Sequence, residues 1–445
     1  MTSAVETLNA TTVKITVTLT EEEFAPMLKH AYEHLGESVN VPGFRKGKVP
    51  AKVLVQRIAR GAAIEHAVND GMGEWYGSAI EEHSLRPLGM PEIDVVRIPG
   101  QVDGDEGLEF TATVDVSPEI TLPAAKSITL TIEEAAVDEA DVDARLASLR
   151  ARFATLTGVD RPAADGDFVT LDLSATVGGV EADAVQGTSY QVGSGSMLEG
   201  LDEVIVGLSA SEETSYEGPL AAGDHAGEPA LIRVKVTGVK ERELPAADDA
   251  FAQLASEFDT IEELRADLRD QVAKVQLNNQ AVQARAALIE HLKTTVTFDV
   301  PTRTIEREVH NHLESEGRLE DDEHRAEVTK EAGEVLRTQI LLDQLAVDLG
   351  VKVEEYEILD FLISMSRQYG MDPEEFIEQM RRANRIPSVV ADVVRSKATA
   401  HALRQAKVKD AKGKVIDLTD VIGSEESDAK RHDAFTAGRE ATKND

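Results

Sequence analysis

A short loop of basic side chains around one aromatic residue carries the clearest chemical signal in this sequence. It reads Gly43-Phe44-Arg45-Lys46-Gly47-Lys48-Val49-Pro50, and every charged residue from Val41 to Arg60 is basic. Over the whole chain, by contrast, 82 Asp and Glu residues outnumber 46 Lys and Arg residues, and the formal net charge is -36. The glycines allow tight backbone turns, and the flanking prolines stiffen the segment. This local reversal of charge indicates a site for an anionic partner, and the alternative is a solvated basic turn.

A second pattern with chemical potential is His30-Ala31-Tyr32-Glu33-His34, which matches the H-x-x-E-H pattern of inverted zinc metallopeptidases. Two histidines on one helix face can bind zinc, and the glutamate can act as a general base. The apolar stripe of this helix, however, consists of Phe24, Met27, Leu28, Ala31 and Leu35. Because this stripe is expected to face the core, both histidines should lie on the opposite, solvent side of the helix. No further ligand is evident nearby. We therefore favour two exposed histidines, and we expect no metal and no other cofactor.

Length and composition narrow the function classes. At 445 residues the chain is too long to fold around one hydrophobic core, and it is expected to divide into about three domains. The absence of Cys excludes disulfides, thiolate metal sites and a cysteine nucleophile. Neither a signal peptide nor an apolar run long enough to span a bilayer is evident, so we expect a cytoplasmic protein without membrane contact. The strong acidity argues against a general nucleic-acid binder, because a negative surface repels phosphate. Any contact with RNA would need a local basic patch.

The basic loop is expected to belong to a compact α+β module of residues 1–117. Alternating apolar residues predict a strand at 13–19, and Thr20 with Glu23 forms a capping box that begins a helix running to about Gly36. Pro50 can begin a second helix, and a third is expected over 64–83. Further strands are predicted at 93–98 and 108–116. The loop would therefore lie between the first two helices of this module.

Residues 118–161 are expected to be a linker, and a β-rich domain is expected at 162–243. The linker carries a predicted strand at 128–132 and a predicted helix at 138–153. Beyond Pro162, short β runs at 168–173, 190–192 and 232–236 alternate with glycine turns, and one short helix is expected at 198–208. A few antiparallel strands around one short helix predict a small α+β domain with its own core.

From residue 244 to 423 the apolar period is helical almost throughout, with Pro301, Pro373 and Pro387 at helix starts. This pattern predicts an all-α body. Its faces, rich in Ala, Leu, Val and Met, can offer shallow apolar patches for loose binding of unfolded chains, or they can be plain contacts between helices. Residues 424–445 are polar and charged, which predicts a disordered tail.

Two segments resemble known families in the identity and order of their residues. The string Gly43 to Pro50 is similar to the ribosome-docking signature of the trigger factor family of bacterial ribosome-associated chaperones. The order Gly193-x-Gly-Ser, Met197-Leu-x-Gly-Leu, short helix, Gly207-Leu resembles the FK506-binding-protein (FKBP) type of prolyl isomerase, the family of the middle domain of trigger factors. The order of modules is also similar, and the resemblance covers about residues 13–420. It implies that the linker 118–161 returns to the helical body. It implies a multidomain α+β fold: an N-terminal α+β ribosome-binding module, an inserted FKBP-like antiparallel β/α domain and an all-α C-terminal chaperone body.

The resemblance also implies partners and a function. The protein would bind the large ribosomal subunit near the exit tunnel. The residues that make this contact would be Gly43, Phe44, Arg45, Lys46, Gly47 and Lys48. The other partners would be nascent and unfolded polypeptides, with a weak homodimer away from the ribosome. The implied function is an ATP-independent chaperone that holds nascent chains open during folding or export. The alternative is a free-standing prolyl isomerase whose helical part is a dimerisation scaffold.

Prolyl isomerisation requires no nucleophile. The barrier to rotation of a peptide bond is about 18–20 kcal/mol, and the twisted transition state loses amide resonance, so an apolar pocket that desolvates the imide can favour it. By resemblance, the positions that line this pocket are Leu173, Ala182, Met197, Leu198, Leu201 and Ile232. All are aliphatic, and the Tyr expected near His225 is absent. We therefore expect weak isomerase activity, or a retained domain in which these residues only fill the core.

Overall fold

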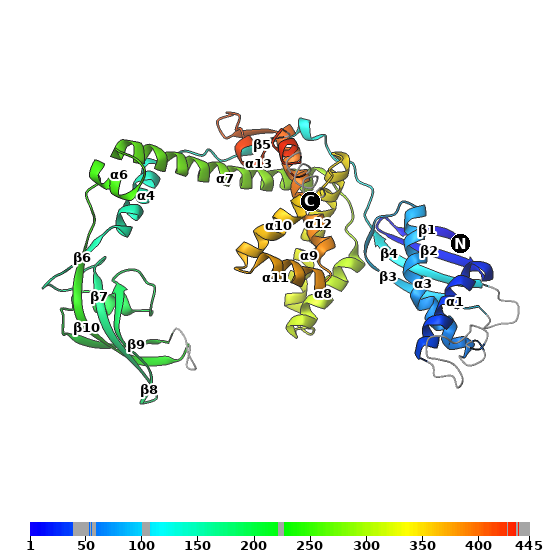
Figure 1. The fold of residues 1–445 in the computed structure, drawn as a ribbon, viewed down its shortest axis with the longest axis horizontal. Coiled ribbons are helices and arrows are strands. Elements are labelled where there is room, and N and C mark those ends of the chain that lie inside the picture. Colours follow the sequence, from blue (N-terminus) through cyan, green and yellow to red (C-terminus); the bar gives the residue numbers. More distant parts are fainter. Residues whose placement is uncertain are drawn as a thin grey trace, which may run out of the picture. The chain divides into compact units, whose positions relative to one another are not determined.

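The chain divides into two compact units in a computed structural model, which describes residues 1–38, 53, 55, 59–99, 107–220, 227–424, 426–432 and 435. One unit combines Met1–Glu134 with Gln280–Asp445, and the other is Ala135–Asn279 (Figure 1). The second unit is therefore an insertion between two segments of the first. The basic loop and most of the helix expected after Pro50 lie outside the described residues.

An antiparallel sheet with strand order β1-β2-β4-β3 forms the N-terminal part of the first unit. Its strands are β1 (Thr2–Asn9), β2 (Thr12–Thr20), β3 (Pro87–Arg97) and β4 (Gly107–Val116). The alternation that predicts β2 has its physical basis here, because Val13, Ile15, Val17 and Leu19 all point into the core. The predicted strands at 13–19, 93–98 and 108–116 are confirmed. Strand β1 was not predicted, since its sequence is largely polar and its residues are mostly exposed.

Helices α1 (Glu21–Ser38) and α3 (Arg60–Glu82) contribute apolar side chains to the same core as this sheet. The predicted capping box is present: the Glu23 amide donates to Thr20 Oγ1 over 3.3 Å, and the Thr20 amide donates to Glu23 Oε2 over 3.0 Å. The rings of Phe24 and Trp75 lie 5.9 Å apart between the two helices. A buried aromatic pair of this kind fixes how α1 and α3 pack together.

The segment expected to be a linker, 118–161, contributes to three structures. Its strand β5 (Thr129–Ile132) pairs in parallel with β11 (Lys407–Asp410), so the first unit also contains a two-stranded sheet. Its helix α4 (Glu139–Arg152) begins at Asp138, whose carboxylate accepts from the Ala140 amide, and belongs to the second unit. Its strand β6 (Thr155–Gly158) enters the β-rich domain. A short 3-10 turn, η1 (Ala125–Ser127), precedes β5.

The β-rich domain has strand order β6-β10-β7-β8, with β9 paired to the other part of β10 (green in Figure 1). Its elements are β7 (Phe168–Val177), β8 (Val180–Gln191), α5 (Leu201–Ile205), β9 (Glu213–Pro219) and β10 (Pro229–Glu243). Because β6 pairs with the end of β10, from Lys240 opposite Gly158 to Glu243 opposite Thr155, the domain begins near 155 rather than at 162. This corrects the N-terminal boundary of the domain.

A small helical cluster completes the second unit. It joins α4 to α6 (Asp249–Ala255) and to the first part of α7 (Ile261–Thr295) around Leu146, Phe251 and Leu268. The Phe153 and Phe251 rings meet edge to face with centroids 5.9 Å apart. The helical segment after 244 therefore divides: its first part packs with α4, and the rest belongs to the first unit.

The helical body consists of the end of α7 and the helices that follow it. These are α8 (Thr302–Glu316), α9 (Asp322–Asp348), α10 (Glu355–Gln368), α11 (Pro373–Arg382), α12 (Ile386–Gln405) and α13 (Thr419–Ile422). The predicted starts at Pro373 and Pro387 are confirmed, and Pro301 occupies the N-cap position of α8. Strand β11 is the departure from an all-helical body within the described residues.

The segment after 424 differs from the expected disordered tail where it is described. Residues 426–432 are helical. The Arg404 guanidinium donates to Asp428 Oδ2 over 2.7 Å, and the Tyr356 ring lies 5.0 Å from that of Phe435. This order arises from contacts with α10 and α12, which composition cannot reveal. None of the described helices has both the length and the apolarity needed to cross a membrane.

Candidate functional site

An apolar cavity of about 320 Å³ opens in the β-rich domain. It is lined mainly by neighbouring strands β7 and β8, by the segment before α5 and by Ile232 of β10. The full lining is Leu173, Ser174, Ala175, Asp183, Ala184, Val185, Thr188, Met197, Leu198, Leu220 and Ile232. None of these side chains is aromatic, and Asp183 is the one that carries a charge. The cavity can therefore accept and desolvate a small apolar group.

Four of the six predicted pocket residues line this cavity: Leu173, Met197, Leu198 and Ile232. The other two do not. Ala182 is exposed and lies at a break in the β7–β8 register, where Ala175 pairs with Asp183 but Thr176 pairs with Glu181. This irregularity offsets β8, and Asp183, Ala184 and Val185 line the cavity instead. A bulge inside a strand leaves little trace in the sequence, so the lining from β8 was missed.

Leu201 is fully buried in the core of the domain and is absent from the cavity lining. It is the first residue of α5, where Gly200 adopts a left-handed conformation with φ of 80°. A larger side chain at this position would overpack the core, at a typical cost of about 1–3 kcal/mol. The expectation that Leu201 lines the pocket is therefore wrong, because this residue belongs to the core of the domain.

A carboxylate on α5 holds the segment that leads to the cavity. Asp202 accepts from the hydroxyl of Tyr190 over 2.8 Å, from the Gly193 amide over 2.6 Å and from the Gly195 amide over 3.0 Å. Burial raises the pKa of Tyr190, with the Asp202 hydrogen bond adding to the effect, so the phenol remains a donor. These bonds fix the turn that precedes Met197. The sequence pattern singled out the glycines but not the carboxylate that binds them.

Tyr216 of β9 was also missed; it pairs with Ile232 of β10, so the two side chains lie on the same face of the sheet. A Cβ atom added at Gly218 would lie 3.0 Å from its ring, and one added at Gly200 would lie 3.3 Å from it, so both glycines make room for the ring. The Tyr216 hydroxyl is buried without a hydrogen-bond partner among the described residues, and burial raises its pKa. The ring packs against the same core as Ile232, which lines the cavity.

The two histidines of the H-x-x-E-H pattern are exposed, as predicted. His34 Nδ1 lies 2.8 Å from His66 Nε2 of α3, which in turn lies 3.2 Å from Asp70 Oδ2. The Glu33 carboxylate pairs with Lys29 over 3.9 Å on the helix surface and not with these rings. Among the described residues, three potential metal ligands converge elsewhere, at His312, Glu316 and His324.

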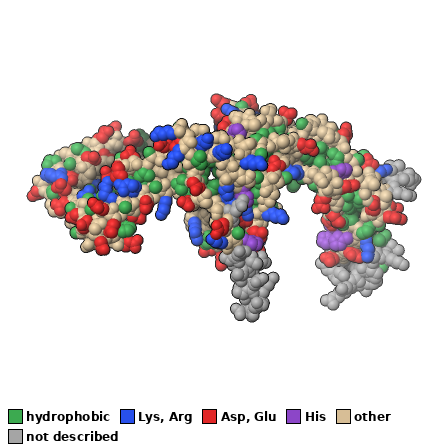
Figure 2. Space-filling view, turned by 90° about the horizontal axis from the view of Figure 1, so that it is seen from above, with side chains coloured by type: hydrophobic (Ala, Val, Ile, Leu, Met, Phe, Trp, Pro, Cys, Tyr) green, Lys and Arg blue, Asp and Glu red, His purple; other side chains and the backbone are tan. Residues whose placement is uncertain are grey.

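The six residues predicted to bind the ribosome, 43–48, lie outside the described residues. The surfaces predicted to hold unfolded chains are described, and their apolar side chains are dispersed. Exposed examples in the helical body are Val282, Val335, Val347, Leu359 and Tyr369. Figure 2 shows the same distribution on one face, with hydrophobic side chains scattered among many Asp and Glu side chains. Such a surface suits weak contacts at many points.

Comparison with known proteins gives consistent results along the chain. Residues 1–149 match the family model described as bacterial trigger factor protein, and residues 260–404 match the model of its C-terminus. The chain is 52% identical to the trigger factor of Beutenbergia cavernae over 430 residues, which is 97% of this chain and 91% of that protein. It is 49% identical to the trigger factor of Leifsonia xyli subsp. xyli over 422 residues, with coverage of 95% and 91%.

A solved structure of the trigger factor chaperone covers 90% of this chain and 99% of its own, with a TM-score of 0.55 and 20% sequence identity, which supports the fold. An α+β N-terminal module, an inserted β-rich domain and a helical body define a multidomain, ribosome-associated folding chaperone. The chain belongs to the trigger factor family. These matches favour the chaperone over the alternative of a free-standing isomerase with a dimerisation scaffold.

Proposed function

We propose that this chaperone docks on the ribosome through residues 43–48 and binds an X–Pro segment of its client in the cavity of the β-rich domain. The observation that supports binding of an X–Pro segment is the open apolar cavity, which has four of the predicted residues in its lining. A prolyl ring that enters it leaves water together with its imide bond, which lowers the barrier to rotation. Because none of the described lining residues is aromatic, the grip on proline is weak and the acceleration modest.

The isomerase proposal is tested on the isolated segment 155–243, which has its own core, with an X–Pro peptide as substrate. Val185→Asn places a polar amide in the cavity wall, whereas Val180→Asn makes the same change on the same strand away from the cavity. Loss of about 1 kcal/mol of apolar contact corresponds to a roughly 5-fold lower kcat/KM. The proposal predicts that loss for Val185→Asn and no loss for Val180→Asn. Equal rates in both variants, or no catalysis by the wild-type segment, would refute it.

The docking proposal rests on the cationic string in a chain of net charge -36. Arg45, Lys46 and Lys48 would meet phosphate or acidic protein on the ribosome, and Phe44 would fill an apolar niche beside them. Replacing Phe44, Arg45 and Lys46 by Ala should abolish co-sedimentation with ribosomes, and wild-type binding should weaken as salt rises.

A matched control replaces one exposed aromatic and two exposed arginines of the helical body, Tyr369, Arg381 and Arg382, by Ala. This control variant should sediment with ribosomes as the wild type does. Undiminished binding of the loop variant would overturn the docking proposal. A chaperone that docks on ribosomes in this way would act in the cytoplasm.

Self-association away from the ribosome is the last part of the proposal. The exposed apolar side chains described on the helical body are dispersed, which suits a weak homodimer better than a permanent interface. Sedimentation velocity over a range of protein concentrations should show a monomer that dimerises only at the high end. A dimer that persists at the lowest concentration would contradict weak self-association.

A further inference from the structure

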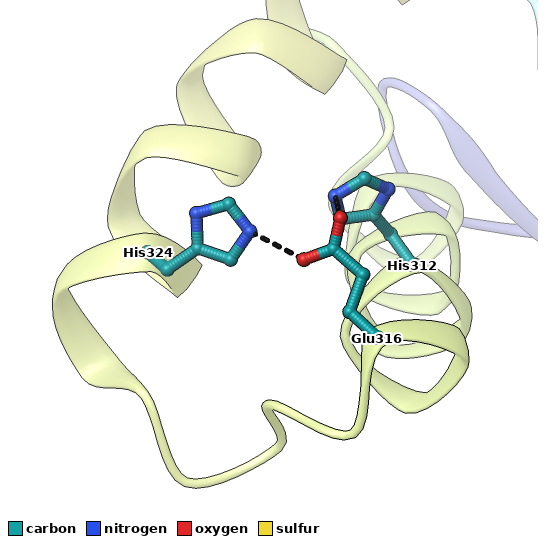
Figure 3. Close-up of side chains that lie close together, drawn as sticks. All are labelled: His312, Glu316 and His324. Carbon is teal, nitrogen blue, oxygen red and sulfur yellow. Dashed lines mark hydrogen bonds and ion pairs between the residues drawn. The ribbon is translucent and has the colours of Figure 1, made fainter. Parts of the chain in front are cut away.

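Two histidines and a glutamate converge where α8 ends and α9 begins. His312 and Glu316 lie one turn apart on α8, and His324 lies in the first turn of α9 (Figure 3). The helices are joined by residues 317–321, and Gly317 adopts a left-handed conformation with φ of 68° that ends α8. This reversal brings His324 to face the other two side chains. The cluster is remote in sequence from the cavity and from the basic loop.

The spacing of the donor atoms fits a single small cation. His312 Nε2 lies 3.3 Å from Glu316 Oε1, and His324 Nε2 lies 2.9 Å from Glu316 Oε2. One ligand atom from each residue lies within 4.8 Å of the others. Since Zn–N and Zn–O bonds are about 2.0–2.1 Å, neighbouring ligand atoms around a tetrahedral ion are roughly 3.3 Å apart. A small movement of His312 toward His324 would complete three corners of such a tetrahedron.

The surroundings orient His324. Its second ring nitrogen, Nδ1, lies 3.7 Å from Glu327 Oε2, so a carboxylate is near the side of the ring away from Glu316 but beyond hydrogen-bond distance. Its backbone amide donates to Asp321 Oδ1 over 3.0 Å, which caps α9 and fixes the first turn. The His324 side chain is 18% exposed, compared with 44% for His312. The site is thus anchored on α9 and open to solvent on the side of α8.

One cation already competes for the glutamate. Arg318 Nη1 lies 3.7 Å from Glu316 Oε2, but its main partner is Asp321, with Nη2 2.7 Å from Oδ2. Arg318 can therefore retain its ion pair with Asp321 while the Glu316 carboxylate binds a metal ion. Two imidazoles and one carboxylate favour a borderline transition ion over Mg²⁺ or Ca²⁺, which prefer oxygen ligands.

We propose that His312, Glu316 and His324 bind one divalent transition ion of the Zn²⁺ class, with water in the fourth position. The ion links the last turn of α8 to the first turn of α9 and pins the connection between them. It differs from the H-x-x-E-H pattern on α1 because the glutamate is itself one of the ligands. The role is to set the geometry of the α8–α9 end of the helical body, not to catalyse hydrolysis.

The test is Zn²⁺ titration of the untagged full-length chain against a chromophoric chelator, followed by Co²⁺ spectroscopy. The wild type should bind one ion at this site and give the intense visible absorption of tetrahedral Co²⁺. His324→Ala and Glu316→Gln should each weaken Zn²⁺ binding at least 10-fold and abolish that absorption. His310→Ala removes an exposed histidine of the same helix and should change neither.

Zn²⁺ binding should also weaken in acid, because a protonated imidazole cannot bind the metal. His34→Ala controls for the histidines that meet on α1 and α3. Circular dichroism of each variant separates loss of the site from loss of the fold. The proposal is overturned if the wild type binds Zn²⁺ no better than the His324→Ala variant, or if His34→Ala alone removes the bound ion.

Discussion

Asp202 should be the polar residue on which the cavity of the β-rich domain most depends. Its carboxylate accepts three hydrogen bonds, from the Tyr190 hydroxyl and from the amides of Gly193 and Gly195. Hydrogen bonds to a charged group contribute about 1.5–3 kcal/mol each, but water can replace the carboxylate at the two exposed amides. The Tyr190 side chain is only 3% exposed, so its hydroxyl would lose a partner that water replaces poorly.

We therefore expect Asp202→Ala to lower the free energy of unfolding of segment 155–243 by about 2–4 kcal/mol. For a domain of this size that loss lowers Tm by roughly 10–20 °C. Glu203→Ala, an exposed change at the next position of α5, should lie within about 0.5 kcal/mol of the wild type. Isomerisation by Asp202→Ala should also slow at a temperature where it remains folded, because the turn before Met197 is no longer held.

A double-mutant cycle with Tyr190→Phe isolates the hydroxyl. The two changes should be less than additive, with a coupling energy of about 1 kcal/mol, because each removes the same bond. Urea and thermal unfolding of the four proteins provide the data. A Tm within about 3 °C of the wild type for Asp202→Ala, or strictly additive changes, would refute the role assigned to this carboxylate.

Three further predictions concern other parts of the chain. The hydrogen bonds from Arg161 lower the pKa of Asp167 in the folded protein. The ionised carboxylate therefore stabilises the β-rich domain at any pH above the ordinary pKa of Asp. This stabilisation is lost as the pH falls through the lowered pKa of Asp167. Asp167→Asn should remove that part of the acid dependence in a series of thermal melts, and an unchanged pH profile would argue against it. Deletion of 155–243 should leave a folded chain that still suppresses aggregation, whereas loss of the helical circular dichroism would count against an independent domain. Arg395→Met breaks a bidentate pair with Asp343 between α12 and α9, in which the two N–O distances are 2.7 and 3.1 Å. The substitution should lower the unfolding free energy of the helical body by about 1–3 kcal/mol, measured by urea titration. An unchanged urea midpoint would show that the pair adds nothing to stability.

Much of the fold follows from local patterns in the sequence. The capping box at Thr20 and Glu23 and the helix from Asp138 to Phe153 were predicted closely, because caps and apolar periods act over a few residues. Strands β6 and β11 escaped prediction because each has only four residues and pairs with a segment far away in the chain. Short strands of this kind are specified by their partners and not by their own composition.

The candidate site divides in the same way. Met197 and Leu198 follow a glycine turn that a motif can reveal, and they line the cavity as predicted. Ala182 was misplaced because a break in the β7–β8 register offsets the strand there, and Leu201 because a buried position and a cavity wall have the same apolar sequence. Asp202 went unnoticed since acidic residues are common in this chain, and only the fold brings its three donors together.

The most direct test of the account compares the two ways in which a client can meet the chaperone. An aggregation-prone protein is either synthesised by purified ribosomes or diluted from denaturant, each time with the wild-type chain or with the variant in which Phe44, Arg45 and Lys46 are Ala. The account predicts that both proteins keep the diluted client soluble, because the helical body is intact, and that only the wild type does so during synthesis. Equal protection by the variant during synthesis would contradict a chaperone that acts from the ribosome through this loop.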